Sequence, residues 1–71
     1  YKNKNIRINS IAPGGIFNNQ SKIFLKKYKE SCNSKGILDS KDLIGLINFL
    51  VSEESKFING QNIVIDDGWS L

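Results

Sequence analysis

The pattern of apolar and polar side chains predicts β-strands near the two ends of the chain. Residues 6–12 are expected to form a strand, with Ile6 and Ile8 on one face and Arg7 and Asn9 on the other. We expect Pro13 to end this strand, because proline has no backbone N–H with which to continue a ladder of hydrogen bonds. Residues 61–65 finish with three consecutive β-branched side chains, a pattern typical of a strand covered on both faces.

The spacing of apolar residues predicts that two helices lie between the strands. The first spans residues 20–31 and is amphipathic, with Asn18 or Asn19 as its expected N-cap. Phe24 and Tyr28 are four positions apart on it, so we expect their rings to pack against each other.

The second predicted helix is apolar around most of its circumference. It is expected to begin at Asp39 or Ser40 and to end near Ser52. Its apolar side chains are Leu43, Ile44, Leu46, Ile47, Phe49, Leu50 and Val51. A helix of this kind must be buried on more than one side. One side can pack on the two strands, so we expect polypeptide outside this chain to cover the other.

Two strands separated by two helices fit adjacent parallel strands joined by a right-handed crossover. A two-stranded parallel sheet cannot cover itself on both faces, so we expect an α/β unit that is incomplete by itself. The 71 residues include one cysteine and no histidine, which rules out an intrachain disulfide and a Cys/His zinc site. The chain has no methionine, even at position 1, which agrees with a piece of a longer polypeptide. The remainder of that parent chain is therefore an expected partner.

The formal net charge is +3, and lysines gather in the middle of the chain at Lys22, Lys26, Lys27, Lys29 and Lys35. We interpret them as a solvated helix face, because no arginine accompanies them and the nearby aromatic rings favour packing over base stacking. No apolar run reaches the roughly 18 residues that a membrane-spanning helix needs. We therefore expect neither nucleic acid nor a membrane as a partner. The single thiol favours a cytoplasmic location.

Residues 9–16, Asn-Ser-Ile-Ala-Pro-Gly-Gly-Ile, resemble the segment that follows the catalytic helix in short-chain dehydrogenases/reductases. The resemblance implies that Ile16, the hydrophobic residue after the turn, presents its backbone to the nicotinamide carboxamide of NAD or NADP. A threonine commonly helps to hold the cofactor two positions later, where Asn18 stands in this chain. The implied cofactor-binding residues are Pro13, Gly14, Gly15, Ile16 and Asn18.

Residues 42–68 resemble the last helix and last strand of the same family. The matching stretches are Asp-Leu-Ile-Gly at 42–45, Ile-Asn-Gly-Gln at 58–61 and Val-Ile-Asp-Asp-Gly at 64–68. The resemblance implies the C-terminal portion of a Rossmann-like, doubly wound parallel sheet. Family members commonly pair these elements with a second subunit, which implies a homo-oligomer, either a dimer or a tetramer. The implied interface residues are Leu46, Phe49, Leu50, Ile63 and Ile65.

The region between these two blocks matches the part of the family that closes over the substrate. The implied substrate-side residues are Phe17, Asn19 and Gln20. The amides of Asn18, Asn19 and Gln20 suit a hydroxylated substrate such as a sugar. The sequences of both blocks are similar to those of bacterial dehydrogenases assigned to flagellin or surface-glycan modification. We expect one domain in three parts: residues 1–12 (helix exit and strand), 13–37 (nicotinamide-side turn and substrate lid) and 38–71 (last helix, last strand and subunit interface).

The chain lacks the residues that the family uses for its chemistry. The Gly-rich cofactor loop and the Tyr-x-x-x-Lys pair are absent, since Asn5 and Cys32 stand four positions after Tyr1 and Tyr28. Asp-Asp-Gly at 66–68 lacks the carboxylate spacing of a calcium loop, so we predict a turn and no metal.

The resemblance therefore implies part of an NAD(P)-dependent enzyme that transfers hydride between nicotinamide and a carbonyl or alcohol. It places no catalytic residue in this chain, and it implies that the 71 residues are inactive by themselves. Two alternatives stay open at this point, which are a stand-alone dimerisation module and a small basic nucleic-acid-binding protein.

Overall fold

The computed structural model describes residues 3–71, and it contains two strands and two α-helices in the order strand, helix, helix, strand. The elements are β1 (Ser10–Pro13), α1 (Lys22–Glu30), α2 (Ile44–Val51) and β2 (Asn62–Ile65), with the short 3-10 segments η1 (Ser40–Leu43) and η2 (Glu53–Ser55) on either side of α2. The predicted helix exit at residues 1–5 lies partly outside the described residues, and residues 3–5 form a turn.

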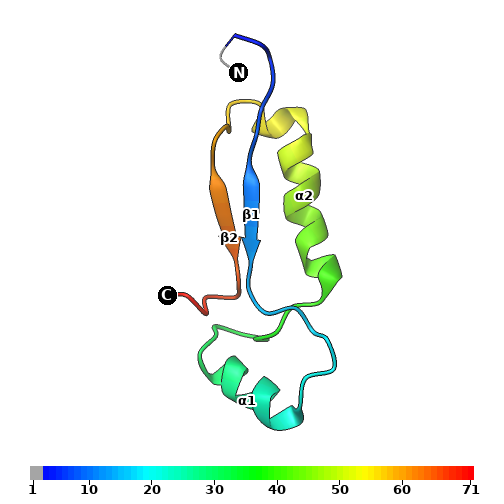
Figure 1. Ribbon diagram of the computed structural model, residues 1–71, viewed down its shortest axis with the longest axis vertical. Coiled ribbons are helices and arrows are strands. Elements are labelled where there is room, and N and C mark those ends of the chain that lie inside the picture. Colours follow the sequence, from blue (N-terminus) through cyan, green and yellow to red (C-terminus); the bar gives the residue numbers. More distant parts are fainter. Residues whose placement is uncertain (1–2) are drawn as a thin grey trace.

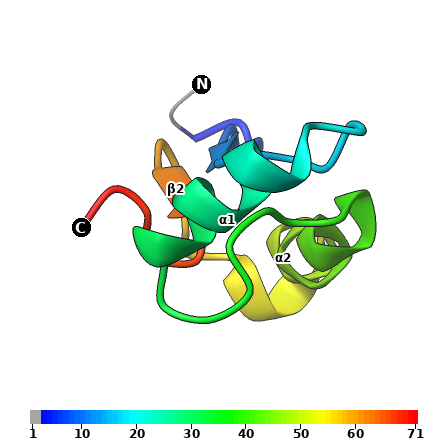
Figure 2. The same ribbon diagram turned by 90° about the horizontal axis from the view of Figure 1, so that it is seen from below.

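The two strands are parallel neighbours in one sheet, which confirms the predicted topology. Ser10 is opposite Asn62 and Pro13 is opposite Ile65, so both strands end at the same level. Helix α2 runs alongside β1, and α1 lies beyond the carboxyl ends of the strands (Figure 1). Figure 2, seen from that end, shows α1 lying across it. The molecule is elongated, with extents of 50 × 22 × 17 Å.

Strand β1 is shorter than the alternating pattern predicts, and it includes Pro13. Before Ser10, two backbone N–H groups bond to asparagine side chains, while one backbone pair remains: Ile8 N–H donates to Asn59 Oδ1 at 3.0 Å, Gln61 N–H donates to Asn9 Oδ1 at 2.9 Å, and Gly60 N–H donates to Ile8 O at 2.8 Å. The regular ladder therefore starts only at Ser10. Proline is tolerated as the last strand residue because the next bond of the ladder is donated by Gly14, whose N–H lies 2.9 Å from Ile65 O.

Helix α1 begins later than the periodicity predicts, and its N-cap is neither Asn18 nor Asn19. The cap is Ser21, whose Oγ accepts a hydrogen bond from Phe24 N–H at 3.1 Å. Asn19 instead has a φ of 57°, a left-handed conformation that turns the chain before the helix. The predicted contact between Phe24 and Tyr28 is confirmed, with ring centroids 6.0 Å apart.

The second predicted helix is confirmed, although its first turn is the 3-10 segment η1 with Asp39 as N-cap. Asp39 N–H donates to Asp42 Oδ2 at 2.8 Å, which secures this end. No residue of α2 is buried in the described chain, and Val51 is 75% exposed. Among the described residues, Leu38 alone forms the buried apolar core. The apolar surface of α2 is thus left largely uncovered by the described residues, as the sequence predicts.

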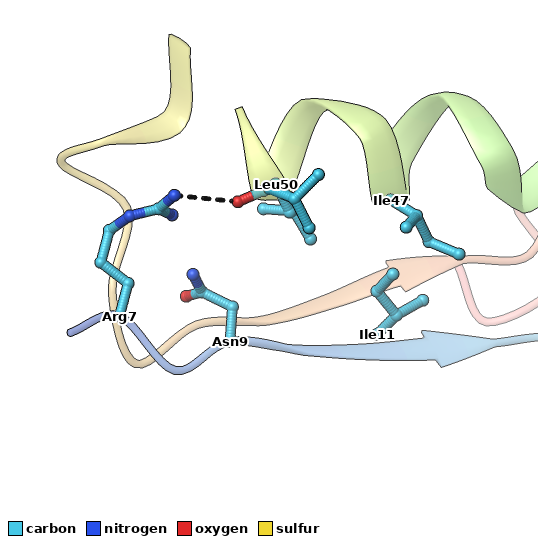
Figure 3. Close-up of a pocket in the computed structure, with 6 residues that line it drawn as sticks. Arg7, Asn9, Ile11, Ile47 and Leu50 are labelled. Carbon is cyan, nitrogen blue, oxygen red and sulfur yellow. Dashed lines mark hydrogen bonds between the residues drawn. The ribbon is translucent and has the colours of Figure 1, made fainter. Parts of the chain in front are cut away.

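Arg7 joins the C-terminal end of α2 to the segment that leads into β1. Its Nη2 donates to Leu50 O at 3.1 Å, and its Nη1 donates to Ser55 Oγ at 3.2 Å. Figure 3 shows this guanidinium reaching the end of α2 from the chain below it. The last carbonyls of a helix have no partners within the helix and carry partial negative charge, so a cation there is stabilising. Ser55 is only 1% exposed, which places this contact at the best-buried polar position described.

We predict that Arg7→Ala lowers the free energy of unfolding by about 1–3 kcal/mol, because it leaves half-buried carbonyls without a charged donor. The measurement is urea unfolding of the longer polypeptide that carries this chain, monitored by circular dichroism. Lys4→Ala, which removes an exposed positive charge nearby, is the control and should change stability little. Equal losses in the two variants would show that charge alone, and not the contact with α2, stabilises the fold.

Candidate functional site

The turn after β1 lies at the carboxyl ends of both strands, where ligands bind in open α/β sheets. Its backbone is held by partners from distant parts of the chain. Gly14 N–H donates to Ile65 O at 2.9 Å, and Gly15 N–H donates to the hydroxyl of Tyr28 at 2.8 Å. The turn is therefore fixed by β2 on one side and by α1 on the other.

Close packing within the chain requires a glycine at the first position of this turn. A Cβ atom on Gly14 would lie 2.6 Å from Asp66 Cβ and 3.0 Å from Asp66 Cα, so a larger residue would push the turn away from that segment. A Cβ atom on Gly15 would lie 2.6 Å from Ile37 Cδ1, the end of a side chain that can move aside, and 3.1 Å from the Tyr28 ring. The glycines thus shape the site by allowing the chain to approach itself.

Ile16 forms an isolated parallel bridge with Leu38 immediately after the turn. The bridge uses the groups on either side of Ile16: Leu38 N–H donates to Gly15 O at 2.9 Å, and Phe17 N–H donates to Leu38 O at 2.7 Å. In a parallel ladder the N–H and C=O of the residue between these two bonds point to the opposite side. Ile16 therefore directs one backbone donor and one backbone acceptor away from Leu38.

A side-chain amide occupies part of this outward-facing edge. Gln20 Nε2 donates to Ile16 O at 3.0 Å, and Gln20 Oε1 accepts from Asn18 N–H at 2.7 Å. The Ile16 N–H has no acceptor among the residues that the structure describes. Of the predicted cofactor and substrate residues, the structure thus brings Ile16, Asn18 and Gln20 together. Asn19 is exposed.

Phe17, another predicted substrate-side residue, lies 48% exposed on the other side of the same segment. It lines a cavity of about 370 Å³ between α1 and the stretch that precedes η1. The remaining lining residues are Leu25, Lys26, Lys29, Lys35, Ile37 and Asp39. The cavity therefore combines the apolar side chains of Phe17, Leu25 and Ile37 with lysines, two of which belong to α1.

Asp67 anchors the loop that follows α1, a role that the sequence did not reveal. Its Oδ2 accepts from Gly36 N–H at 2.7 Å, its Oδ1 accepts from Ser34 Oγ at 2.8 Å, and its backbone O accepts from Asn33 N–H at 2.7 Å. Hydrogen bonds from the Gly36 backbone and the Ser34 side chain hold the pKa of the Asp67 carboxyl below its usual value. The predicted turn at residues 66–68 is confirmed, and it also ties the loop that follows α1 to the end of β2.

Trp69 adds an aromatic contact to the same network. Its ring stacks on Tyr28 with centroids 5.7 Å apart and an interplanar angle of 7°. Tyr28 is therefore held by Trp69 while its hydroxyl holds the turn at Gly15. The four-residue spacing of Phe24 and Tyr28 was the only sequence signal for this role.

Two other candidate groups have structural explanations. Desolvation raises the pKa of the Cys32 thiol, and the carboxylates of Asp67 and Asp66 raise it further, so the thiol is not activated as a nucleophile. Lys35 pairs with Asp42, whose side-chain hydrogen bond raises the pKa of the lysine. The lysines of α1 are exposed, as expected for a solvated face.

A second cavity, of about 410 Å³, lies between the segment leading through β1 and α2 (Figure 3). It is lined by Arg7, Asn9, Ile11, Ile47, Leu50 and Val51. This groove is at the amino-terminal side of β1, away from the turn, so we interpret it as a packing surface. Of the predicted interface residues, Leu46, Leu50, Ile63 and Ile65 are half-buried and Phe49 is 38% exposed.

The described residues hold no group of three or more histidine, cysteine, aspartate or glutamate side chains arranged to bind a metal ion. None of the helices in residues 3–71 has the length and apolar character needed to cross a membrane.

Residues 1–70 match a family model described as enoyl-(acyl carrier protein) reductase. The chain is 56% identical to the post-translational flagellin modification protein A of Campylobacter coli, over 97% of this chain and 27% of that protein. It is 36% identical to the 7alpha-hydroxysteroid dehydrogenase of Bacteroides fragilis, over 96% of this chain and 28% of that protein.

Solved structures agree with these matches. A short chain dehydrogenase from Leptospira borgpetersenii with bound NAD+ superposes with a TM-score of 0.86 at 40% identity, over 92% of this chain and 26% of that chain. A 4-hydroxyisoleucine dehydrogenase complexed with NADH gives a TM-score of 0.82 at 32% identity, over 92% of this chain and 29% of that chain. The chain thus spans about a quarter of the length of the proteins it matches. The predicted Rossmann-like fold class is confirmed.

We predict that the Asp67 anchor weakens in acid. Because the pKa of the folded carboxyl lies below the unfolded value of about 3.9, its contribution is present above that value and is lost as the pH falls through the folded pKa. Urea unfolding of the complete polypeptide that carries this chain, between about pH 7 and about pH 3, should show a steeper acid loss of stability in the unsubstituted protein than in Asp67→Asn. Identical pH profiles would contradict the role of this carboxylate.

We predict that Tyr28→Phe destabilises the chain by about 1 kcal/mol, because Gly15 N–H loses its acceptor while the stack on Trp69 remains. Faster amide hydrogen exchange at Gly15 should accompany the change. Tyr28→Leu removes both contacts and should cost more. If Tyr28→Phe leaves exchange at Gly15 unchanged, the hydroxyl does not hold the turn.

Proposed function

This chain belongs to the short-chain dehydrogenase/reductase family, and we propose that it forms the nicotinamide-side wall and the substrate lid of an NAD(P)-dependent oxidoreductase. The parent enzyme transfers hydride between the nicotinamide and a carbonyl or alcohol. The chain spans about a quarter of its relatives, so this activity is proposed for the longer polypeptide and not for these residues by themselves.

The outward-facing backbone of Ile16 is the observation that carries the proposal. A primary carboxamide offers one acceptor and an NH2 donor, and Ile16 offers a complementary N–H and C=O at the carboxyl end of the sheet. Because the bridge to Leu38 and the packing at the glycines fix this edge, the positions of the donor and the acceptor are preorganised, and only the side chain of Gln20 is bonded to the acceptor. The residues present therefore fit the nicotinamide group of the cofactor, which supplies or accepts the hydride.

Each residue of the turn has a defined part in this proposal. Pro13 ends β1, and Gly14 and Gly15 bring the chain close to β2 and α1. Asn18 lies two positions after Ile16, where its side-chain amide can add a further contact to the cofactor. The bound NAD+ and NADH of two similar structures support a nicotinamide dinucleotide as the ligand.

The substrate is proposed to be a hydroxylated, carbohydrate-derived molecule. Phe17 and the amides of Asn19 and Gln20 border the segment that would face it. The flagellin modification protein of Campylobacter coli, which is 56% identical, supports a role in surface-glycan or flagellin modification. The general acid of the reaction must come from another part of the parent polypeptide, because this chain has no Tyr-x-x-x-Lys pair.

We assign the uncovered apolar surfaces to contacts within the parent protein and between its subunits. The proposed interface residues are Leu46, Phe49, Leu50, Ile63 and Ile65. Their partial exposure supports a homo-oligomer, a dimer or a tetramer, in which a second copy covers α2 and β2. A cytoplasmic location fits the single, unactivated thiol.

The test is hydride transfer by the complete polypeptide that carries this chain. We expect NAD(P)H to form or disappear, by absorbance, when the polypeptide is given carbohydrate alcohols or ketones, and we expect none with the isolated 71-residue chain. Turnover by the isolated chain would contradict the proposal. A complete polypeptide that binds no dinucleotide would do the same, and a folded 71-residue dimer in sedimentation would instead favour an interaction module.

A further inference from the structure

Gln20 holds the same edge of Ile16 that the proposed cofactor needs. Its carboxamide nitrogen donates to Ile16 O, and its carboxamide oxygen accepts from Asn18 N–H, so one primary amide spans two backbone groups two positions apart. The side chain is half-buried, and both distances, 3.0 and 2.7 Å, are those of well-formed hydrogen bonds.

The nicotinamide ring carries the same chemical group, a primary carboxamide. Its NH2 needs an acceptor, and the carbonyl of Ile16 is the acceptor on the edge that faces away from Leu38. We propose that Gln20 is an internal stand-in for the nicotinamide carboxamide and that the cofactor must displace it from Ile16. This inference rests on the proposed function, because it concerns the same site.

The displacement requires little rearrangement of the rest of the site. The bridge between Ile16 and Leu38 uses other backbone groups, so it persists when Gln20 leaves. Helix α1 is capped by Ser21 and does not depend on the Gln20 side chain. Rotation of one side chain therefore frees the carbonyl of Ile16 and the N–H of Asn18 together.

The exchange also links the cofactor to the lid. The stretch between Ile16 and α1 is exposed from Phe17 to Asn19, and the two bonds of Gln20 are the side-chain contacts that hold it to Ile16 and Asn18. When nicotinamide replaces Gln20, Asn18 loses this side-chain contact while Phe17 N–H stays bonded to Leu38 O, and the glutamine amide becomes available on the substrate side. Cofactor binding thereby changes the segment that would contact the substrate.

The decisive experiment measures the affinity of the complete polypeptide for NAD+ and for ADP-ribose by isothermal titration calorimetry, or for their 2′-phosphorylated counterparts if it prefers NADP+. Gln20→Ala should bind NAD+ about three- to tenfold more tightly, the equivalent of one net hydrogen bond no longer broken. Its affinity for ADP-ribose should not change, because ADP-ribose has no carboxamide. Gln20→Met, which keeps the length of the side chain without its amide, should behave as Gln20→Ala does.

Gln61→Ala is the matched control, since Gln61 Nε2 donates only to Asn59 O, at 3.2 Å, away from the turn. It should leave both affinities unchanged. Unchanged or weaker NAD+ binding in both Gln20 variants would overturn the inference while leaving the proposed function intact. An equal change for NAD+ and ADP-ribose would also overturn it, because the carboxamide would not be involved. If the unaltered polypeptide binds neither ligand, the proposed function fails and the inference fails with it.

Discussion

The parallel pairing of β1 with β2 is the contact on which the rest of the structure depends. It joins the two ends of the chain and brings both strands to an end at the same level. The turn at Gly14 therefore lies directly against Asp66, and the next residue, Asp67, reaches the loop after α1. The candidate site is built around this meeting point, and without the pairing neither the turn nor the loop after α1 would be held in place.

The order and pairing of the elements could be predicted from the sequence, because periodicity reports which faces of a strand or helix are apolar. The two predictions that were wrong, the length of β1 and the N-cap of α1, have local physical causes. The alternation over residues 6–9 indicates an extended chain, but the side chains of Asn9 and Asn59 take bonds that a longer ladder would use. The N-cap of α1 was misassigned because several consecutive polar residues precede it, and only the geometry distinguishes Ser21 from Asn18 and Asn19.

The features of the candidate site could likewise be predicted only in part. The position of the turn follows from a short local segment, so residues 9–16 were enough to predict it. The backbone role of Ile16 was implied only by the family resemblance of that segment, and its outward direction depends on the bridge to Leu38. The roles of Tyr28 and Asp67 depend on contacts between segments far apart in the chain, and no spacing or motif encodes those contacts. Gln20 was predicted to face the substrate. Its bond to Ile16 O depends on the fold of the stretch between them, which the left-handed backbone of Asn19 sets. The roles assigned to the cofactor, substrate and interface residues stay predictions.

The tight approach of Gly14 to Asp66 has an evolutionary consequence. A methyl group at position 14 would collide with the Cβ atom of residue 66, and every amino acid except glycine carries that atom. No exchange of one side chain for a smaller one at position 66 can therefore make room, short of glycine itself. Position 14 is therefore confined to glycine unless the strands move apart, whereas position 66 can exchange its side chain freely, so we expect only the first of the two to stay constant across descendants of this sequence.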